Sequence, residues 1–280
     1  MTGLDAIRQD TYPYVDRPFW EQWQTAVDKQ YPNLVVTGEI TARTPAVLSF
    51  FEGGARRRGV DTRLKSMLDF PLEAATRAVF GQGQPMTVLT DILAQDSLYQ
   101  RPEMLVVFPG NHDQPRFLNV AGGDVRKLLM ATAFVLTTRR TVHLYYGDEI
   151  AMAGGNDPDN RRDFPPASFT PAGRTGDAAA VYDRTRALLR FRAAHPALRR
   201  GTLTQLLVNA DQYAFLRSSP EEHVVVVLNR SGKTLELDVE DLPLADGLRL
   251  TSYEGGAEIA VAQRKLAIPA GEVGIWWVKR

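Results

Sequence analysis

The triplet Asn111-His112-Asp113 places an amide, an imidazole and a carboxylate directly after an apolar run. That run, residues 105–108, has the pattern of a short parallel strand covered on both faces. The carboxyl ends of such strands are where α/β sheets hold their binding and catalytic side chains. Asn and Asp also form ordinary turns, so the triplet alone is compatible with either role.

Two further carboxylates also follow apolar runs. Arg8 and Asp10 share one face of a predicted strand because strand side chains alternate. We expect a buried Asp10 that the guanidinium keeps ionised, as a nucleophile requires. Glu39 follows the run of residues 34–38. A helix cap or a turn could explain each acid singly, but three acids at separate strand ends favour a shared site.

Four ordered segments carry a resemblance to a known family. They are GLDAIRQDTYPY (residues 3–14), NLVVTGEI (33–40), FPGNHDQPRF (108–117) and LYYGDEIAMAGG (144–155). Together they resemble sequence blocks of the alpha-amylase superfamily, glycoside hydrolase family thirteen. The TYPY after the first acid is most similar to its neopullulanase and cyclomaltodextrinase branch.

The resemblance implies a retaining glycosidase acting on α-glucans such as maltodextrins or cyclodextrins. Asp10 corresponds to the nucleophile, Glu39 to the general acid/base, and Asp113 to the third catalytic carboxylate, which binds and distorts the sugar. Further substrate contacts are implied for four residues: Arg8, His112, Asn111 and Tyr14.

Retaining hydrolysis needs two carboxyl groups about 5–5.5 Å apart, one as nucleophile and one as proton donor. The donor must be protonated before cleavage. We therefore expect the pKa of Glu39 to be raised by burial and by the charges of Asp10 and Asp113. The same covalent intermediate would also support transglycosylation or isomerisation.

The chain departs from the family pattern at several positions. Pro13-Tyr14 replaces a usual Lys-His, Ile40-Thr41 replaces a usual Trp, and His143 stands near a position that is usually Pro. We interpret His143 as a packed strand residue. No counterpart of the family's third-strand block occurs, so the resemblance implies strands four to eight of the barrel without strands one to three.

The resulting fold prediction is α/β, a partial TIM (β/α)8 barrel followed by an antiparallel β-sandwich. Residues 1–197 would form the barrel portion and residues 198–280 the sandwich. Besides the strands that precede the three acids, the pattern predicts helices over residues 19–30, 71–80, 124–138 and 183–194, and strands over residues 64–70 and 142–146. Short runs separated by turn residues after residue 201 predict the sandwich, with Trp276 and Trp277 as core and edge aromatics.

The composition is that of a globular protein with a sizeable core, because 44% of the 280 residues are hydrophobic. Basic and acidic residues balance at 33 each, which gives no reason to expect nucleic acid or a membrane as partner. The chain has no cysteine, so disulfides and thiolate metal sites are excluded. The sequence leaves the compartment open, with the cytoplasm favoured.

The reaction requires no cofactor, but calcium is a candidate ligand. Residues 156–160 (NDPDN) offer the oxygen ligands that calcium prefers. A plain turn is the alternative, and the loop could also border the sugar site.

Two functional classes remain open at this stage. The chain could be the catalytic portion of a glycosidase, or a non-catalytic or partner-dependent fragment of one. Five strands of an eight-stranded barrel leave two strand edges unpaired, and such edges favour association. We therefore expect a partner, either a complementing N-terminal half or a second copy of the chain.

Overall fold

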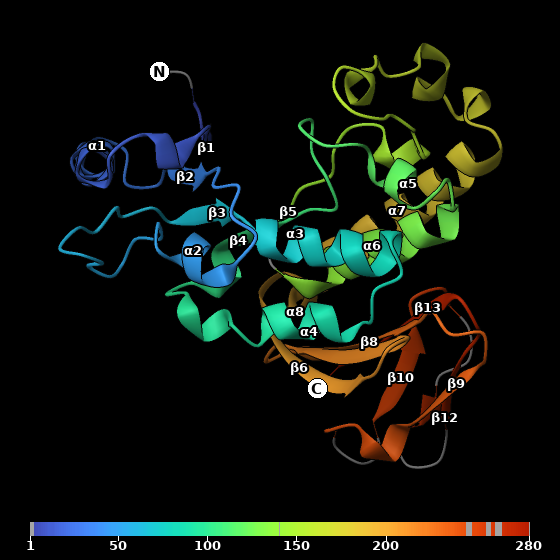
Figure 1. Ribbon diagram of the computed structural model, residues 1–280. Coiled ribbons are helices and arrows are strands. Elements are labelled where there is room, and N and C mark those ends of the chain that lie inside the picture. Colours follow the sequence, from blue (N-terminus) through green and yellow to red (C-terminus); the bar gives the residue numbers. More distant parts are fainter. Residues whose placement is uncertain (1–2, 140, 245–247, 256–258, 261–264, 280) are drawn as a thin grey trace.

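The computed structural model describes residues 3–139, 141–244, 248–255, 259–260 and 265–279. Strands and helices alternate in the amino-terminal part, whereas the carboxyl-terminal part consists mainly of strands (Figure 1). The first part contains β1 (Ala6–Gln9), α1 (Arg17–Gln30), β2 (Val35–Gly38), α2 (Pro45–Ser49), β3 (Ser66–Leu68), α3 (Phe70–Thr76), α4 (Thr87–Leu93), β4 (Leu105–Val107), α5 (Phe117–Val120), α6 (Val125–Thr138), β5 (Thr141–Val142), α7 (Gly176–Ala194) and α8 (Pro196–Arg200). The second contains β6 (Thr202–Val208), β7 (Gln212–Ser218), β8 (Glu222–Asn229), β9 (Leu235–Asp238), β10 (Arg249–Ser252), β11 (Ile259–Ala260), β12 (Lys265–Ile268) and β13 (Glu272–Lys279).

The first five strands form one parallel sheet in sequence order, β1-β2-β3-β4-β5. The central strands β3 and β4 are buried at every position, as their apolar runs predicted. All five strands point the same way, so the loops after β1, β2 and β4, which carry the three predicted acids, meet at one edge of the sheet. This arrangement confirms the predicted partial barrel.

The last strand of this sheet is shorter than predicted. The sequence pattern suggested a strand over residues 142–146, but β5 ends at Val142, although the His143 N–H still donates to the Val107 carbonyl (2.8 Å). Tyr145 and Tyr146 turn away to pack against the buried Arg116 guanidinium, 4.5 and 4.8 Å from their ring centres. The cation–π contacts explain why the extended backbone stops early.

Two of the predicted helices begin at side-chain caps. The Asp69 carboxylate accepts a hydrogen bond from the Leu72 N–H (3.1 Å) at the start of α3, and Asp124 accepts one from Arg126 N–H (2.9 Å) at α6. The other two helices start earlier than predicted: α1 begins at Arg17 and α7 at Gly176. All four nevertheless lie where the sequence placed them.

The carboxyl-terminal strands form a six-stranded antiparallel sheet, β11-β10-β13-β8-β7-β6, and a two-stranded sheet, β12-β9. Apolar side chains from both sheets build a common core that includes Leu216, Val227, Leu266 and Trp276. The predicted sandwich-like arrangement is therefore present, with Trp276 in its core as expected. Among the described helices, none has the length and apolar character needed to cross a membrane.

A second apolar core joins the two parts of the chain. In Figure 1 the β6–β8 region lies against α4, α6 and α8, and Phe134 of α6 contacts Phe80, Tyr213 and Phe215 across this junction (ring centres 5.6, 6.4 and 6.5 Å apart). Polar contacts add to it: Glu222 of β8 accepts from the Ala197 N–H (3.0 Å) and pairs with His195 (2.7 Å). The barrel strands are thus held by helices that are themselves packed against the sandwich.

We expect Phe134→Ala to lower the free energy of unfolding by about 3–5 kcal/mol, because it opens a cavity where the two parts meet. Leu189→Ala is the matched control, since Leu189 lies on α7 with 38% of its surface exposed, and its effect should stay within about 0.5 kcal/mol. Urea unfolding of both variants measures the difference. Equal and small losses would contradict a shared core at Phe134.

Candidate active site

Arg8 bridges the first two predicted acids. Its Nη1 donates to Asp10 Oδ1 (3.1 Å), and its Nη2 pairs with Glu39 Oε1. The parallel pairing of β1 with β2 makes this possible, because Gln9 lies opposite Gly38 and the next residue of each strand is a carboxylate. The Thr11 N–H also donates to Glu39 Oε2 (3.2 Å). One guanidinium therefore holds both carboxyl groups at the same sheet edge.

The pKa values of these two carboxyls are shifted in opposite directions. Glu39 is 4% exposed, and burial, followed by a hydrogen bond with Asp10, raises its pKa, although Thr11 and Arg8 act in the opposite direction. The hydrogen bond with Glu39, then the charge of Arg8, lowers the pKa of Asp10. Shifts in these two directions favour Glu39 as a proton donor and Asp10 as a nucleophile.

The predicted burial of Asp10 is wrong. Its side chain is 63% exposed, because β1 ends at Gln9 and, within the described residues, β1 pairs on one side only. The contact with Arg8 is present as predicted, so the carboxylate is held by the guanidinium without being enclosed.

The Asn111-His112-Asp113 triplet lies in the loop after β4. Asn111 is 3% exposed, and its Oδ1 accepts from the Asp113 N–H (3.0 Å), so it holds the loop. His112 Nε2 lies 3.3 Å from Asp113 Oδ1. Both His112 and Asp113 side chains are partly exposed, and the charge of His112 also acts on Asp10. The loop therefore faces the same site as β1, while the sugar contact assigned to Asn111 stays a prediction.

Asp113 does not contribute to the raised pKa of Glu39 as we expected. The like charge that raises the pKa of Glu39 is that of Asp10, and Arg8 opposes it, whereas Asp113 Oδ1 pairs with Arg161 Nη2 (3.0 Å). Arg161 follows directly after residues 156–160, the loop that the sequence suggested could border the sugar site. It is a site residue that the prediction missed, because the two residues lie 48 positions apart.

His143 and Tyr14, the two remaining residues that the sequence analysis singled out, differ in burial. His143 is half-buried and stacks on Phe108, with ring centres 5.8 Å apart. Burial, then the charges of Arg8 and His112, lowers its pKa, so it is neutral and packed, as the sequence suggested. Tyr14 is 84% exposed, and its role in sugar binding stays a prediction.

A buried ion pair between Arg116 and Asp148 lies where the chain leaves the triplet loop. Arg116 is 1% exposed, and its Nη1 donates to the Tyr146 carbonyl (2.6 Å) and to Asp148 Oδ1 (3.3 Å). Burial raises the pKa of Asp148 to about 7, with Arg116 opposing the shift. Both residues belong to the resembling segments, so the FPGNHDQPRF and LYYGDEIAMAGG blocks contained the signal for them.

The side chains of the NDPDN loop make contacts within the chain, and calcium binding there stays a prediction. Asp157 pairs with Arg161 (2.9 Å) and Asp159 with Arg162, while Asn160 Nδ2 donates to the His112 and Gln114 carbonyls (2.7 and 2.8 Å). Among the described residues there is no group of three or more His, Asp or Glu side chains able to hold a metal ion. The loop borders the Asn111-His112-Asp113 triplet. This position agrees with the interpretation that the loop lies beside the proposed sugar site.

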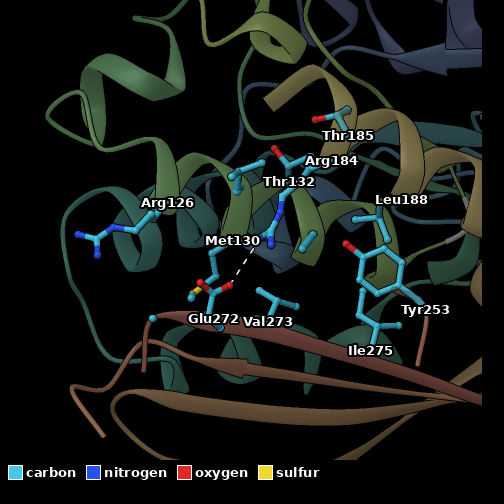
Figure 2. Close-up of a pocket in the computed structure, with 13 residues that line it drawn as sticks. Arg126, Met130, Thr132, Arg184, Thr185, Leu188, Tyr253, Glu272, Val273 and Ile275 are labelled. Atoms are coloured by element: carbon cyan, nitrogen blue, oxygen red, sulfur yellow. Dashed lines mark ion pairs between the residues drawn. The ribbon is translucent and has the colours of Figure 1, made fainter. Parts of the chain in front are cut away.

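A small cavity lies elsewhere, between α6, α7 and β13 (Figure 2). Its volume is about 60 Å³, and its walls include Met130, Leu188 and Tyr253, with an ion pair between Arg184 and Glu272 (3.6 Å). None of the predicted site residues lines it. The candidate site is therefore the open sheet edge and not this cavity.

Comparison with known families shows which family this chain belongs to. The alpha-amylase catalytic domain matches residues 8–201, which is more than half of the chain and includes all three acids. The chain belongs to the alpha-amylase family. That assignment agrees with the resemblance carried by the four sequence segments.

Individual relatives in this family are longer than the chain. It is 29% identical over 241 residues to a cyclomaltodextrinase of Geobacillus thermopakistaniensis (strain MAS1), covering 84% of this chain and 38% of the relative. It is 30% identical over 276 residues to a beta/alpha-amylase of Paenibacillus polymyxa, covering 95% of this chain and 21% of the relative. Among solved structures, an Anoxybacillus alpha-amylase is similar with a TM-score of 0.85 and 25% identity, covering 99% of this chain and 59% of that chain. This alpha-amylase-family chain thus spans well under two thirds of the relatives' length.

The two carboxyls should titrate in opposite directions from their ordinary values. We expect the pKa of Asp10 to lie below 3.8 and that of Glu39 to lie above 4.5. Carbon-13 NMR of the carboxyl signals during a pH titration measures both values. The variants Asp10→Asn and Glu39→Gln assign the two signals. A Glu39 that titrates at or below Asp10 would contradict the division of roles.

The raised pKa of Glu39 also has a consequence for stability. The folded state binds its proton more tightly than the unfolded state, so this contribution is complete below pH 4.5 and is lost as pH rises through the folded pKa. The unfolding free energy of the wild type should therefore fall as pH rises above 4.5. This fall should be smaller in Glu39→Gln, whereas in Glu240→Gln, a substitution of an exposed residue, it should equal that of the wild type. Urea unfolding at a series of pH values tests this, and parallel curves for wild type and Glu39→Gln would contradict it.

Proposed function

We propose that this chain carries the catalytic carboxyls of a retaining glycosidase that acts on α-glucosidic bonds of maltodextrins, cyclodextrins or related α-glucans. The observation that carries the proposal is the Arg8 bridge, which joins an exposed Asp10 with a lowered pKa to a buried Glu39 with a raised pKa. Membership of the alpha-amylase family supports the choice of α-glucans. The names of the relatives, cyclomaltodextrinase and cyclomaltodextrin glucanotransferase, point to the same substrate class.

The reaction follows from the two protonation states. The Asp10 carboxylate attacks the anomeric carbon while Glu39 donates its proton to the glycosidic oxygen, and the aglycone leaves with a free hydroxyl. Glu39, now ionised, takes a proton from water, whose oxygen attacks the same carbon and releases Asp10. An acceptor sugar in place of water gives transglycosylation. These steps use only carboxyl groups and water, so we propose that no cofactor takes part.

Asp113 and His112 supply the sugar contacts in this proposal. Asp113 Oδ1 is occupied by Arg161 and His112, and the side chain is 46% exposed. An exposed carboxylate beside an imidazole can accept from sugar hydroxyls while the guanidinium keeps it oriented. Arg8, Tyr14 and Asn111 complete the proposed substrate-binding set.

A second candidate function is a catalytic portion that depends on a partner. Within the described residues, β1 and β5 are edge strands of the parallel sheet. Three large apolar side chains in the residues before and after β1 are exposed: Leu4, Tyr14 and Phe19, at 63%, 84% and 50%. Unpaired edges with exposed apolar residues favour pairing. We propose that a polypeptide carrying further parallel strands completes the barrel here, with a second copy of the chain as the alternative.

Replacing either carboxyl should abolish turnover of maltodextrin. We expect Asp10→Asn and Glu39→Gln each to reduce kcat/KM by about 10²–10⁴-fold or more, because they remove the nucleophile and the proton donor. The cleaved product should keep the α configuration, which proton NMR of a fresh digest reports. Near-normal turnover of Glu39→Gln, or β-configured products, would contradict the proposal.

The partner proposal predicts that the 280-residue chain associates in solution. Size-exclusion chromatography with light scattering measures its mass, and hydrolysis of maltoheptaose is measured on the same fractions. We expect an oligomer, or a monomer that becomes active only when the remaining barrel strands are added. A monomer that turns over at about 1–10³ s⁻¹ on its own would show that the five strands suffice.

A further inference from the structure

Arg77 contacts both ends of the loop that carries the polar triplet. Its Nη1 donates to the Pro109 carbonyl (3.3 Å) and its Nη2 to the Pro115 carbonyl (3.0 Å). The loop between these carbonyls contains Asn111, His112 and Asp113. Arg77 follows α3, on the segment after β3, so it reaches across from the neighbouring strand's connection.

An ion pair with Glu73 holds the Arg77 guanidinium from its own segment of the chain. Its Nε lies 3.3 Å from Glu73 Oε1, one helical turn earlier, and the side chains of Arg77 and Glu73 are 13% and 2% exposed. Burial raises the pKa of Glu73 to about 7, and Arg77 and then Gln114, a residue of the same loop, oppose the shift. Arg77 presents its planar fork to two carbonyls, a geometry that Lys does not reproduce.

Gly110 leaves room in the loop for the Arg77 side chain. A Cβ atom at Gly110 would lie 3.1 Å from Arg77 Nη1, so the absence of a side chain there allows the close approach. On its other side, the loop is held by Asn160 and Arg161, which donate to the His112 carbonyl (2.7 and 3.0 Å). Two opposing sets of donors therefore define one conformation of the triplet.

We propose that Arg77 is a positioning residue, which holds residues 109–115 in the conformation that lets Asp113 and His112 bind sugar. It acts through the loop and does not touch the substrate. This inference rests on the proposed glycosidase function for its catalytic readout, but the hold on the loop can be measured without any substrate.

The chain offers a control arginine that also binds two carbonyls, Arg101, whose side chain is 33% exposed against 13% for Arg77. Arg101 Nη2 donates to the carbonyls of Gly53 and Leu64 (2.9 and 3.0 Å), and its Nε lies 4.0 Å from Glu52, which is 2% exposed. Arg101 precedes β4, whereas the triplet loop follows it, so the two arginines lie at opposite ends of that strand. Arg77→Met and Arg101→Met remove the same type of hold at different places.

Hydrogen exchange by mass spectrometry is the direct test. A peptide covering residues 110–118 reports two protected amides, those of Asp113 (bonded to Asn111 Oδ1) and Arg116 (bonded to the Gly154 carbonyl, 2.9 Å). We expect Arg77→Met to speed exchange of this peptide by about tenfold or more, because buried carbonyls lose charged donors. Arg101→Met should leave it at the wild-type rate. Unchanged exchange in Arg77→Met, or an equal rise in both variants, would overturn the proposal.

Kinetics with maltoheptaose then separate positioning from stability. We expect Arg77→Met to lower kcat/KM by about 10²-fold, the scale on which a displaced group costs activity, while Arg101→Met retains wild-type kcat and KM. Arg77→Lys keeps the charge beside Glu73 but lacks the fork, so partial recovery is expected, and this variant replaces Arg77→Met if the latter does not fold. Wild-type kinetics in Arg77→Met would overturn the positioning role. A wild type without turnover, both alone and combined with the remaining barrel strands, would refute the proposed function, and the exchange result would still decide whether Arg77 holds the loop.

Discussion

The contact of one guanidinium with two carboxyls is the interaction on which this site depends. Arg8 lies between Asp10 and Glu39, and without it two acids would meet at a sheet edge with nothing to balance their charge. Repulsion between like charges would then disfavour ionisation of both acids at once, and the proton would go to whichever acid is harder to ionise. Burial of Glu39 and exposure of Asp10 set that preference, so the position of each acid relative to solvent decides its chemical role.

Placing these groups requires parts of the chain that are distant in sequence. The parallel sheet brings the ends of β1, β2 and β4 to one edge, but the loop after β4 needs support of its own. Arg77 supplies it from one side and the loop of residues 156–162 from the other. The helices behind the sheet are packed in turn on the antiparallel strands through the core around Phe134. The sandwich therefore contributes to the site by fixing the layer on which the barrel strands rest.

Local patterns made much of this predictable. The buried strands were visible as apolar runs, and α6 was visible as an apolar segment that begins after a capping Asp124. The carboxyls and their order came from resemblance to the alpha-amylase family. What the sequence could not give depended on contacts over long separations. Asp10 is exposed because β1 lacks a second neighbour in the described chain, and β5 ends early because Arg116 draws Tyr145 and Tyr146 aside. The same holds for Arg161 on Asp113 and Arg77 on the Pro109 and Pro115 carbonyls, which involve separations of 48, 32 and 38 residues.

The claim that Asp10 is the nucleophile of a retaining reaction can be tested by trapping its covalent intermediate. The chain, alone or combined with the remaining barrel strands, is treated with 5-fluoro-α-D-glucosyl fluoride, digested, and mapped by mass spectrometry. We predict one added fluoroglucosyl group on the peptide that contains Asp10, and its loss from the Asp10→Asn variant. A label on another carboxylate, or hydrolysis of the reagent without any trapped intermediate, would contradict the account.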